Sequence, residues 1–162
     1  MKKHIGAIAA SMILFASCLK VTEQPATESS SSQATAKDAN TLTSVEAVNT
    51  TVTTESALKT AIANAKAGDI ITVSGTIKLT STLQLLNSGT SSSKINFTGG
   101  TLDGSGISSG WVVKCNGSYW NITNMTIKNG PDAGLVFQAG GYNYVSNVTT
   151  TGNHDTGLQI YN

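Results

Sequence analysis

The sequence predicts an all-β fold, a right-handed parallel β-helix of about four rungs with a helix capping its N-terminal end. Residues 118–138 match residues 141–161 without a gap. A Gly or Asn also recurs two positions after an apolar residue in successive repeats. The composition agrees, because Thr, Ser and Asn number 23, 19 and 13 of 162 residues and Arg is absent, whereas long helical proteins draw on Ala, Leu, Glu, Lys and Arg.

The near-neutral charge of the chain excludes one class of partner. The formal net charge is +1 at pH 7, while a nucleic-acid-binding protein needs a cationic face to meet the phosphates. We therefore expect no nucleic-acid partner.

Residues 1–17 are typical of an export signal. Lys2 and Lys3 precede an apolar run from Ile5 to Leu19, which as a helix covers roughly 22 Å, short of the roughly 30 Å hydrocarbon core. The pattern predicts a signal peptide rather than a membrane span. The segment that ends at Cys18 resembles the cleavage box of bacterial lipoproteins, which implies lipidation of Cys18 and a membrane anchor. An ordinary secretory signal is the alternative, so we expect an outer-membrane or cell-surface lipoprotein, or a secreted protein.

Residues 18–53 are predicted to be a disordered linker. Ser, Thr, Ala, Gln and Glu dominate this stretch, and no period of 2 or 3.6 residues is sustained in it. Such a composition favours a soluble tether over folded structure. We assign residues 54–162 to the capping helix and the first rungs of a solenoid that we expect to continue beyond Asn162.

Residues 55–67 are predicted to form the capping helix. Its apolar positions follow the spacing of one helix face and are Leu58, Ala61, Ile62 and Ala65. Thr54 can cap the start of the helix, and Gly68 can end it in a left-handed turn. A short strand over residues 70–73 is expected next.

The repeats place a tight corner once in each rung. The recurring apolar residues are Val73, Phe97, Ile122 and Val145, and the residues two positions later are Gly75, Gly99, Asn124 and Asn147. Gly and Asn tolerate a left-handed backbone, so the same corner conformation is expected at each of them. Asn124 and Asn147 should lie one above the other with their side-chain amides hydrogen-bonded.

Each rung is expected to have a third strand, and in the rung of Ile122 it follows residues 130–131. Its alternation predicts that Leu135 and Phe137 point inward and that Val136 points outward. The predicted equivalents are Trp111 and Val113 in the preceding rung, and Leu158 and Ile160 in the following one. An antiparallel sandwich of short strands is the alternative fold, but it does not explain an ungapped self-match as long as a whole rung.

Four segments carry a resemblance to a known family. They are Ala67–Ile71, Gly99–Gly104, Trp120–Ile127 and Asn153–Ile160. The stretch from Thr54 to Asn162 resembles the N-terminal rungs of bacterial pectate lyases, most closely those of polysaccharide lyase family nine. The resemblance implies an enzyme that cleaves pectate, an acidic plant polysaccharide, by β-elimination.

The resemblance also implies Ca²⁺ as a cofactor. Calcium would bridge the uronate carboxylate and stabilise the carbanion-like transition state, while a Lys side chain removes the C5 proton. The calcium-binding aspartates and the Lys base of the family are expected beyond Asn162. We therefore assign no catalytic residue and no metal ligand in this chain, and we expect it to be inactive by itself.

A small set of polar residues remains as candidates for substrate contact. Asp132 and Asp155 align in the self-match, so they should be neighbours on successive turns, where turn chemistry also explains them. His154 and Asp155 are the substrate-binding candidates, since an imidazole beside a carboxylate can hydrogen-bond a sugar. Lys114 and Lys128 are expected to be solvated strand residues rather than bases.

The aromatic and thiol side chains have two readings each. Tyr119, Tyr142, Tyr144 and Trp120 form either a sugar platform or stacks that link one rung to the next. Cys115 follows a strand-like run and is expected to be a small buried hydrophobe rather than a nucleophile.

Two classes of function remain open. The first is a pectate-lyase-type enzyme, and the second is a non-catalytic β-helix that serves as a surface adhesin or carbohydrate-binding scaffold. A fold by itself does not choose between them. The paired carboxylates of a polygalacturonase-like hydrolase are not visible in the sequence.

Overall fold

The structure is a computed structural model, and it describes residues 46–161. The predicted signal segment 1–17, Cys18 and the linker up to residue 45 lie outside these residues. Among the described residues, no helix is long and apolar enough to cross a membrane.

Short parallel strands make up most of the described chain. Its elements are β1 (Asn49–Val52), α1 (Glu55–Asn64), β2 (Ile70–Val73), β3 (Thr76–Lys78), β4 (Leu83–Leu85), β5 (Ile95–Thr98), β6 (Thr101–Asp103), β7 (Val113–Cys115), β8 (Trp120–Lys128), β9 (Leu135–Phe137), β10 (Tyr144–Thr151) and β11 (Leu158–Ile160). Every strand pair among residues 46–161 is parallel. The predicted parallel β-helix is therefore confirmed.

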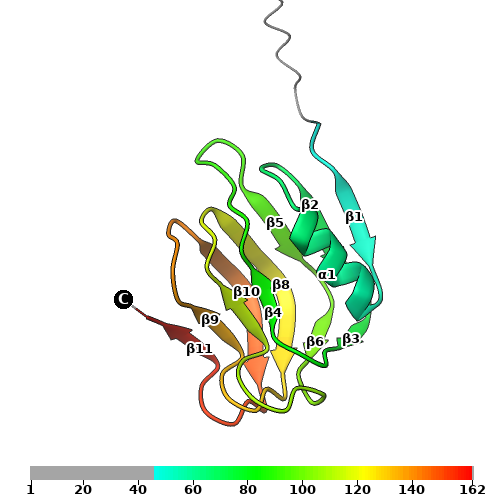
Figure 1. Cartoon of the computed structure of the whole chain (residues 1–162), viewed down its shortest axis with the longest axis vertical. Helices are drawn as coiled ribbons and strands as arrows, with labels where there is room; N and C mark the ends of the chain where they lie inside the picture. The colour runs from blue at the N-terminus through cyan, green and yellow to red at the C-terminus, as the bar shows by residue number, and fades with distance from the viewer. Residues whose placement is uncertain (1–45, 162) are drawn as a thin grey trace, which may run out of the picture. The chain divides into compact units, whose positions relative to one another are not determined.

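The strands stack on three faces (Figure 1). The first face holds β1, β2, β5 and the first halves of β8 and β10, and the second holds β3, β6 and the second halves of β8 and β10. The third face is the separate sheet β4-β7-β9-β11. The first face has five levels, one more than the predicted four.

The rung length agrees with the predicted repeat in the later part of the chain. Val145 lies opposite Ile122, and Leu158 lies opposite Leu135, both as the self-match predicted. Phe97 lies opposite Ile122, again as predicted. The match of Val73 to Phe97 was wrong, because Ile71 is the partner of Phe97. The corner between β2 and β3 contains one residue more than the later corners, and Gly75 corresponds to Gly100 rather than Gly99. Matching Gly75 to Gly99 therefore shifted β2 by two residues.

The repeated left-handed corner is confirmed. The φ angles are +75° at Gly75, +82° at Gly99, +53° at Asn124 and +51° at Asn147. Asn147 Nδ2 donates to Asn124 Oδ1 at 2.9 Å, which is the predicted amide ladder.

The third face differs from the prediction in two places. Val113 rather than Trp111 lies opposite Leu135, and Cys115 lies opposite Phe137, because the loop between β6 and β7 is longer than its counterpart in the next rung. Val136 is fully buried although it was predicted to point outward. A strand of three residues is too short for alternation to decide exposure.

The capping helix forms where it was predicted, but it ends three residues earlier. Thr54 Oγ1 accepts a hydrogen bond from Ala57 N at 3.3 Å, as an N-cap should, while Leu58 and Ile62 are buried. The helix ends at Asn64 because Asn87 Nδ2 binds the last carbonyls, those of Ile62, Ala63 and Ala65, at 3.2, 3.0 and 2.9 Å. Gly68 is left-handed, with φ +96°, in the loop that follows.

The folded part also begins earlier than the linker boundary placed it. Strand β1, Asn49–Val52, lies within the stretch assigned to the linker and pairs in register with β2. Val52 is buried under the helix end of the solenoid, whereas the rest of this Thr-rich strand is half-exposed or exposed. A strand with one buried residue lacks the apolar–polar alternation by which a strand is recognised in a sequence.

Candidate functional site

The predicted substrate contacts lie on an exposed turn before β11. Asp155 N donates to Asp132 O at 3.1 Å, so the two aspartates are neighbours on successive turns, as expected. His154 N donates to Gly130 O at 3.0 Å. The side chains of His154 and Asp155 are exposed. The backbone bonds explain the turn, and substrate binding by this pair stays a prediction.

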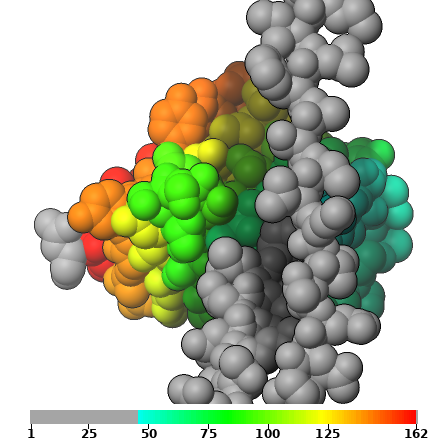
Figure 2. Space-filling view, turned by 90° about the horizontal axis from the view of Figure 1, so that it is seen from above, coloured from blue at the N-terminus to red at the C-terminus, as the bar shows by residue number. Residues whose placement is uncertain are grey.

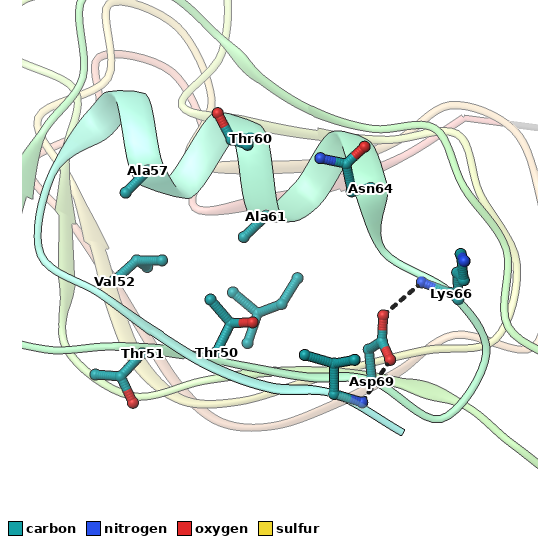
Figure 3. Close-up of a pocket in the computed structure, with 11 residues that line it drawn as sticks. Thr50, Thr51, Val52, Ala57, Thr60, Ala61, Asn64, Lys66 and Asp69 are labelled. Atoms are coloured by element: carbon teal, nitrogen blue, oxygen red, sulfur yellow. Dashed lines mark hydrogen bonds between the residues drawn. The ribbon is translucent and has the colours of Figure 1, made fainter. Parts of the chain in front are cut away.

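Asp69 has a structural role. It is buried, and its two carboxylate oxygens accept hydrogen bonds from the backbone N–H groups of Val48 and Lys66, each at 2.8 Å (Figure 3). These bonds tie the chain before β1 to the loop after α1. The carboxylate therefore has its partners within the protein.

Asp103 is also held by its neighbours. Its pKa is lowered, first by the Ser105 backbone N–H, which lies 2.9 Å from Oδ1, and further by Asn129 Nδ2 at 3.1 Å and the Lys128 cation at 3.8 Å, while partial burial opposes the shift. A carboxylate with a lowered pKa is a poor general base at neutral pH.

The described residues do not fit a calcium site. No three His, Cys, Asp or Glu side chains within residues 46–161 come together as metal ligands. Calcium takes six to eight oxygen ligands. Of the four aspartates of these rungs, Asp132 and Asp155 are neighbours, whereas Asp69 and Asp103 lie in other rungs. No step of a reaction can be derived through calcium on this part of the chain.

Lys114 and Lys128 each have a partner within the protein, and the Cys115 thiol is buried. Lys114 Nζ lies 5.3 Å from the centroid of the Trp111 ring, and Lys128 pairs with Asp103. Burial raises the pKa of Cys115 to about 12, and its thiol lies 3.5 Å from the Gly117 carbonyl oxygen. The prediction of Cys115 as a buried hydrophobe is confirmed.

Two of the four predicted platform residues stack on each other, and a third, Tyr144, follows two residues after Tyr142. The rings of Tyr119 and Tyr142 stack with centroids 5.0 Å apart and planes 8° from parallel. Tyr142 is 78% exposed and Tyr144 is 53% exposed. We call Tyr119, Tyr142 and Tyr144 the tyrosine edge. Trp120 is not part of it, because its ring is buried and its Nε1 donates to Asn87 O at 2.7 Å.

An open groove of about 670 Å³ lies between β1 and α1 (Figure 3). Its walls are small or apolar at Val52, Ala57 and Ala61, and Thr50 and Thr60 also line it. Its one carboxylate is Asp69, which already accepts two backbone bonds. Of the described residues that line the groove, Lys66 is the one that carries an amine.

A solved structure of known activity shares this fold. The crystal structure of an alginate lyase from Paenibacillus sp. str. FPU-7 matches with a TM-score of 0.60 at 24% sequence identity, over 68% of this chain and 39% of the alginate lyase. At that identity the likeness shows a shared fold, and this chain spans well under half of the alginate lyase. No curated protein matches the chain.

A family match extends over most of the chain. The family described as "Pel9A-like, right handed beta helix region" matches residues 39–162. The resemblance inferred from the four sequence segments is thereby confirmed at the level of the family and of a polysaccharide-lyase-like fold. Since the match covers more than half of the sequence, this chain belongs to the Pel9A-like right-handed β-helix family.

Proposed function

We propose that this chain forms the N-terminal rungs of a polysaccharide lyase that cleaves a uronate-containing polysaccharide, with pectate as the first candidate substrate. Membership of the Pel9A-like family over residues 39–162 carries this proposal. The shared fold of an alginate lyase supports the class of reaction and leaves the identity of the uronate open.

The reaction is a β-elimination. A base removes the C5 proton, which is acidified by the adjacent carboxylate, and the electron pair forms a C4–C5 double bond. The C4–O bond to the leaving sugar breaks, and the leaving oxygen takes up a proton. The chemistry needs a free base and stabilisation of the developing charge.

The described rungs supply a scaffold for this reaction rather than its reacting groups. Lys128 is paired with Asp103, Lys114 lies over Trp111, and the Cys115 thiol is buried with a raised pKa. No metal-ligand cluster forms among residues 46–161, and we place the base and the calcium ligands outside these residues, in rungs that continue the solenoid.

Export is part of the same proposal. Pectate is a polymer outside the bacterial cell, so an enzyme that acts on it must leave the cytoplasm. A signal peptide over residues 1–17 with lipidation at Cys18 would hold the enzyme at the surface. A Cys18→Ser variant should move from the membrane fraction to the soluble exported fraction, and an unchanged distribution would argue for plain secretion.

The coding sequence that follows Asn162 provides the direct test. We expect it to continue the repeat with several Asp residues and a Lys within the next rungs. The extended protein should release unsaturated product from polygalacturonate or alginate, with loss of activity when calcium is chelated. A coding sequence that stops at Asn162, or an extended protein that releases no unsaturated product from either polymer, would exclude the lyase function.

A non-catalytic carbohydrate-binding scaffold is the second candidate. The exposed tyrosine edge favours it, since solvent-exposed aromatic rings can hold a sugar without cleaving it. Binding of polysaccharide by the extended protein without any elimination would select this second function.

A further inference from the structure

Tyr119 and Tyr142 occupy an unusual backbone conformation. Their φ angles are +59° and +58°, in the left-handed region that bulky L residues rarely adopt. Every other left-handed residue within 46–161 is a Gly or an Asn. Tyr therefore replaces Gly or Asn at one left-handed corner, and this corner recurs in two successive rungs.

The corner does not need a tyrosine to form. Tyr119 N donates to Gly141 O at 3.0 Å, and Tyr119 O accepts from Ile95 N at 3.1 Å. The Asn143 side chain adds bonds to Trp120 N at 2.9 Å and to Gly117 O at 3.0 Å. Backbone and side-chain bonds from neighbouring rungs hold this corner, so an Asn would serve there as it does at the corner of Asn124 and Asn147. The choice of Tyr needs another reason.

Two tyrosines of the tyrosine edge are exposed to solvent, and the third, Tyr119, is half-exposed. Two of them stack, and Tyr142 and Tyr144 leave 78% and 53% of their surface exposed. The segments that carry them enter β8 and β10 at the upper edge in Figure 1, beside the loop that enters β5. Figure 2 looks down on this edge and shows that green loop standing next to the yellow and orange segments. Aromatic faces carry negative charge density, which suits the weakly positive C–H face of a pyranose ring.

A cation and amide groups accompany the rings. Lys94 precedes β5, and its Nζ lies 6.0 Å from the centroid of the Tyr144 ring. Lys94 forms no salt bridge with any residue between 46 and 161. Tyr144 lies opposite Asn121, whose Nδ2 donates to Asn96 Oδ1 at 2.9 Å. An ammonium group beside the exposed ring of Tyr144 favours a sugar that carries a carboxylate.

We propose that the tyrosine edge and Lys94 form a binding site for an acidic polysaccharide. Pyranose rings pack on Tyr142 and Tyr144, and a uronate carboxylate pairs with Lys94. The choice of a uronate polymer rests on the proposed function. The site holds the polymer on the first rungs while other residues carry out the cleavage.

Asparagine variants separate binding from folding. In Tyr119→Asn and Tyr142→Asn the corner keeps a residue that tolerates a left-handed φ, so the thermal midpoint of the 162-residue chain should stay the same or rise. Binding of oligogalacturonate, measured by calorimetry, should weaken about tenfold with the loss of each ring contact. Lys94→Gln should weaken binding of the acidic oligomer and reduce its dependence on salt.

Tyr161→Asn is the matched control. Tyr161 is 43% exposed and packs against Trp111, with centroids 6.4 Å apart, on the third face. Its replacement should leave the affinity for oligogalacturonate unchanged. A lower thermal midpoint with unchanged affinity in Tyr142→Asn would mean that the tyrosines only link the rungs, and equal binding of a neutral dextran would overturn the role of Lys94.

Binding by the 162-residue chain and cleavage by the extended protein can be measured separately. A 162-residue chain that binds none of the acidic oligomers would overturn this site and leave the lyase function to the assay of the extended protein. An extended protein that binds through the tyrosine edge without elimination would keep the site and exclude the lyase.

Discussion

Single corner residues decide whether a rung can stack on the one before it. A side-chain Cβ at Gly99 would lie 2.8 Å from the Val73 carbonyl oxygen, and φ at Gly99 is +82°. At Asn124 and Asn147 the same corner tolerates a side chain and gains an amide bond between rungs. The corner that runs through Tyr119 and Tyr142 accepts strain that an Asn would relieve, which is why we connect it to function.

Replacing Gly99 by Ala should destabilise the fold. The new methyl group meets the backbone of the previous rung, and a left-handed Ala costs about 1–2 kcal/mol before that clash is added. Urea denaturation of Gly99→Ala should show at least this loss. Gly141→Ala is the control, because a Cβ there meets nothing within 4 Å; equal losses in both variants would contradict the role of the corner.

The Asp103 carboxylate should make stability depend on acidity. Its pKa is lowered from 3.8 in the folded protein, so its stabilising contribution is present above that pH and is lost as the pH falls through the folded pKa. Asp103→Asn should lower the thermal midpoint at neutral pH, and the difference from the unmodified chain should shrink in strong acid. Asp155→Asn, at an exposed carboxylate, should change little at either pH, and a constant difference for Asp103→Asn would contradict the pKa shift.

At the scale of elements, α1 closes the first rung and needs a partner from another segment to end correctly. The helix packs against β1, β2 and β4 (Figure 1). Leu58 and Ile62 fill the space between them. Asn87, from the loop after β4, donates to the carbonyls of Ile62, Ala63 and Ala65, of which the Ile62 carbonyl also accepts from Ala65 N. A solenoid end without such a cap exposes core and strand edges.

Removing the Asn87 amide should loosen this cap. In Asn87→Ala the carbonyls of Ala63 and Ala65 lose the amide donor, while that of Ile62 keeps Ala65 N, and we expect a loss of about 1–3 kcal/mol. Thermal denaturation measures the loss, and hydrogen exchange should show faster exchange in α1 than in β8. Asn64→Ala is the matched control, since Asn64 is exposed on the last helical position, and an equally large loss there would contradict the assignment.

At the scale of the whole molecule, one rung differs from the others. Leu135 is fully buried, whereas its partner in the next rung, Leu158, is 48% exposed, and Ile160 is 69% exposed. Strands β10 and β11 have a neighbouring strand on one side only among the described residues. This apolar surface is one on which another rung or another molecule could pack.

The 162-residue chain should therefore self-associate at high concentration. Light scattering should show a concentration-dependent mass, because burying apolar surface is favourable. Ile160→Lys should shift the chain toward monomer, whereas Gln159→Lys, at the half-exposed polar position between Leu158 and Ile160, should not. A monomer at all concentrations would contradict this expectation.

The sequence predicted this solenoid where rungs have equal length. The ungapped match placed Val145 on Ile122 and Leu158 on Leu135, because each rung must present the same residue to the same neighbour. It failed at Trp111, where a longer loop shifts the register, and at β1, where a Thr-rich strand has the composition of a linker. The contact between Asn87 and α1 spans distant segments, and no local pattern reveals it.

The sequence predicted the tyrosines of the candidate site but not their left-handed backbone conformation. Nothing in the residue type of Tyr119 or Tyr142 indicates a left-handed φ, since Gly and Asn are the residues that signal it. The Tyr that recurs at equivalent positions of two rungs, just after Gly140 and Gly141 in the second, was the signal available. The place of Lys94 beside Tyr144 follows only from the stacking of β5, β8 and β10.

The central claim is that residues 46–161 hold a polysaccharide and leave its cleavage to residues outside them. The most direct test is the ultraviolet absorbance of unsaturated product when the 162-residue chain is mixed with polygalacturonate and calcium. We predict that the absorbance stays flat while calorimetry shows binding. A steady rise in absorbance that calcium chelation abolishes would show a reaction centre within the chain and contradict the claim.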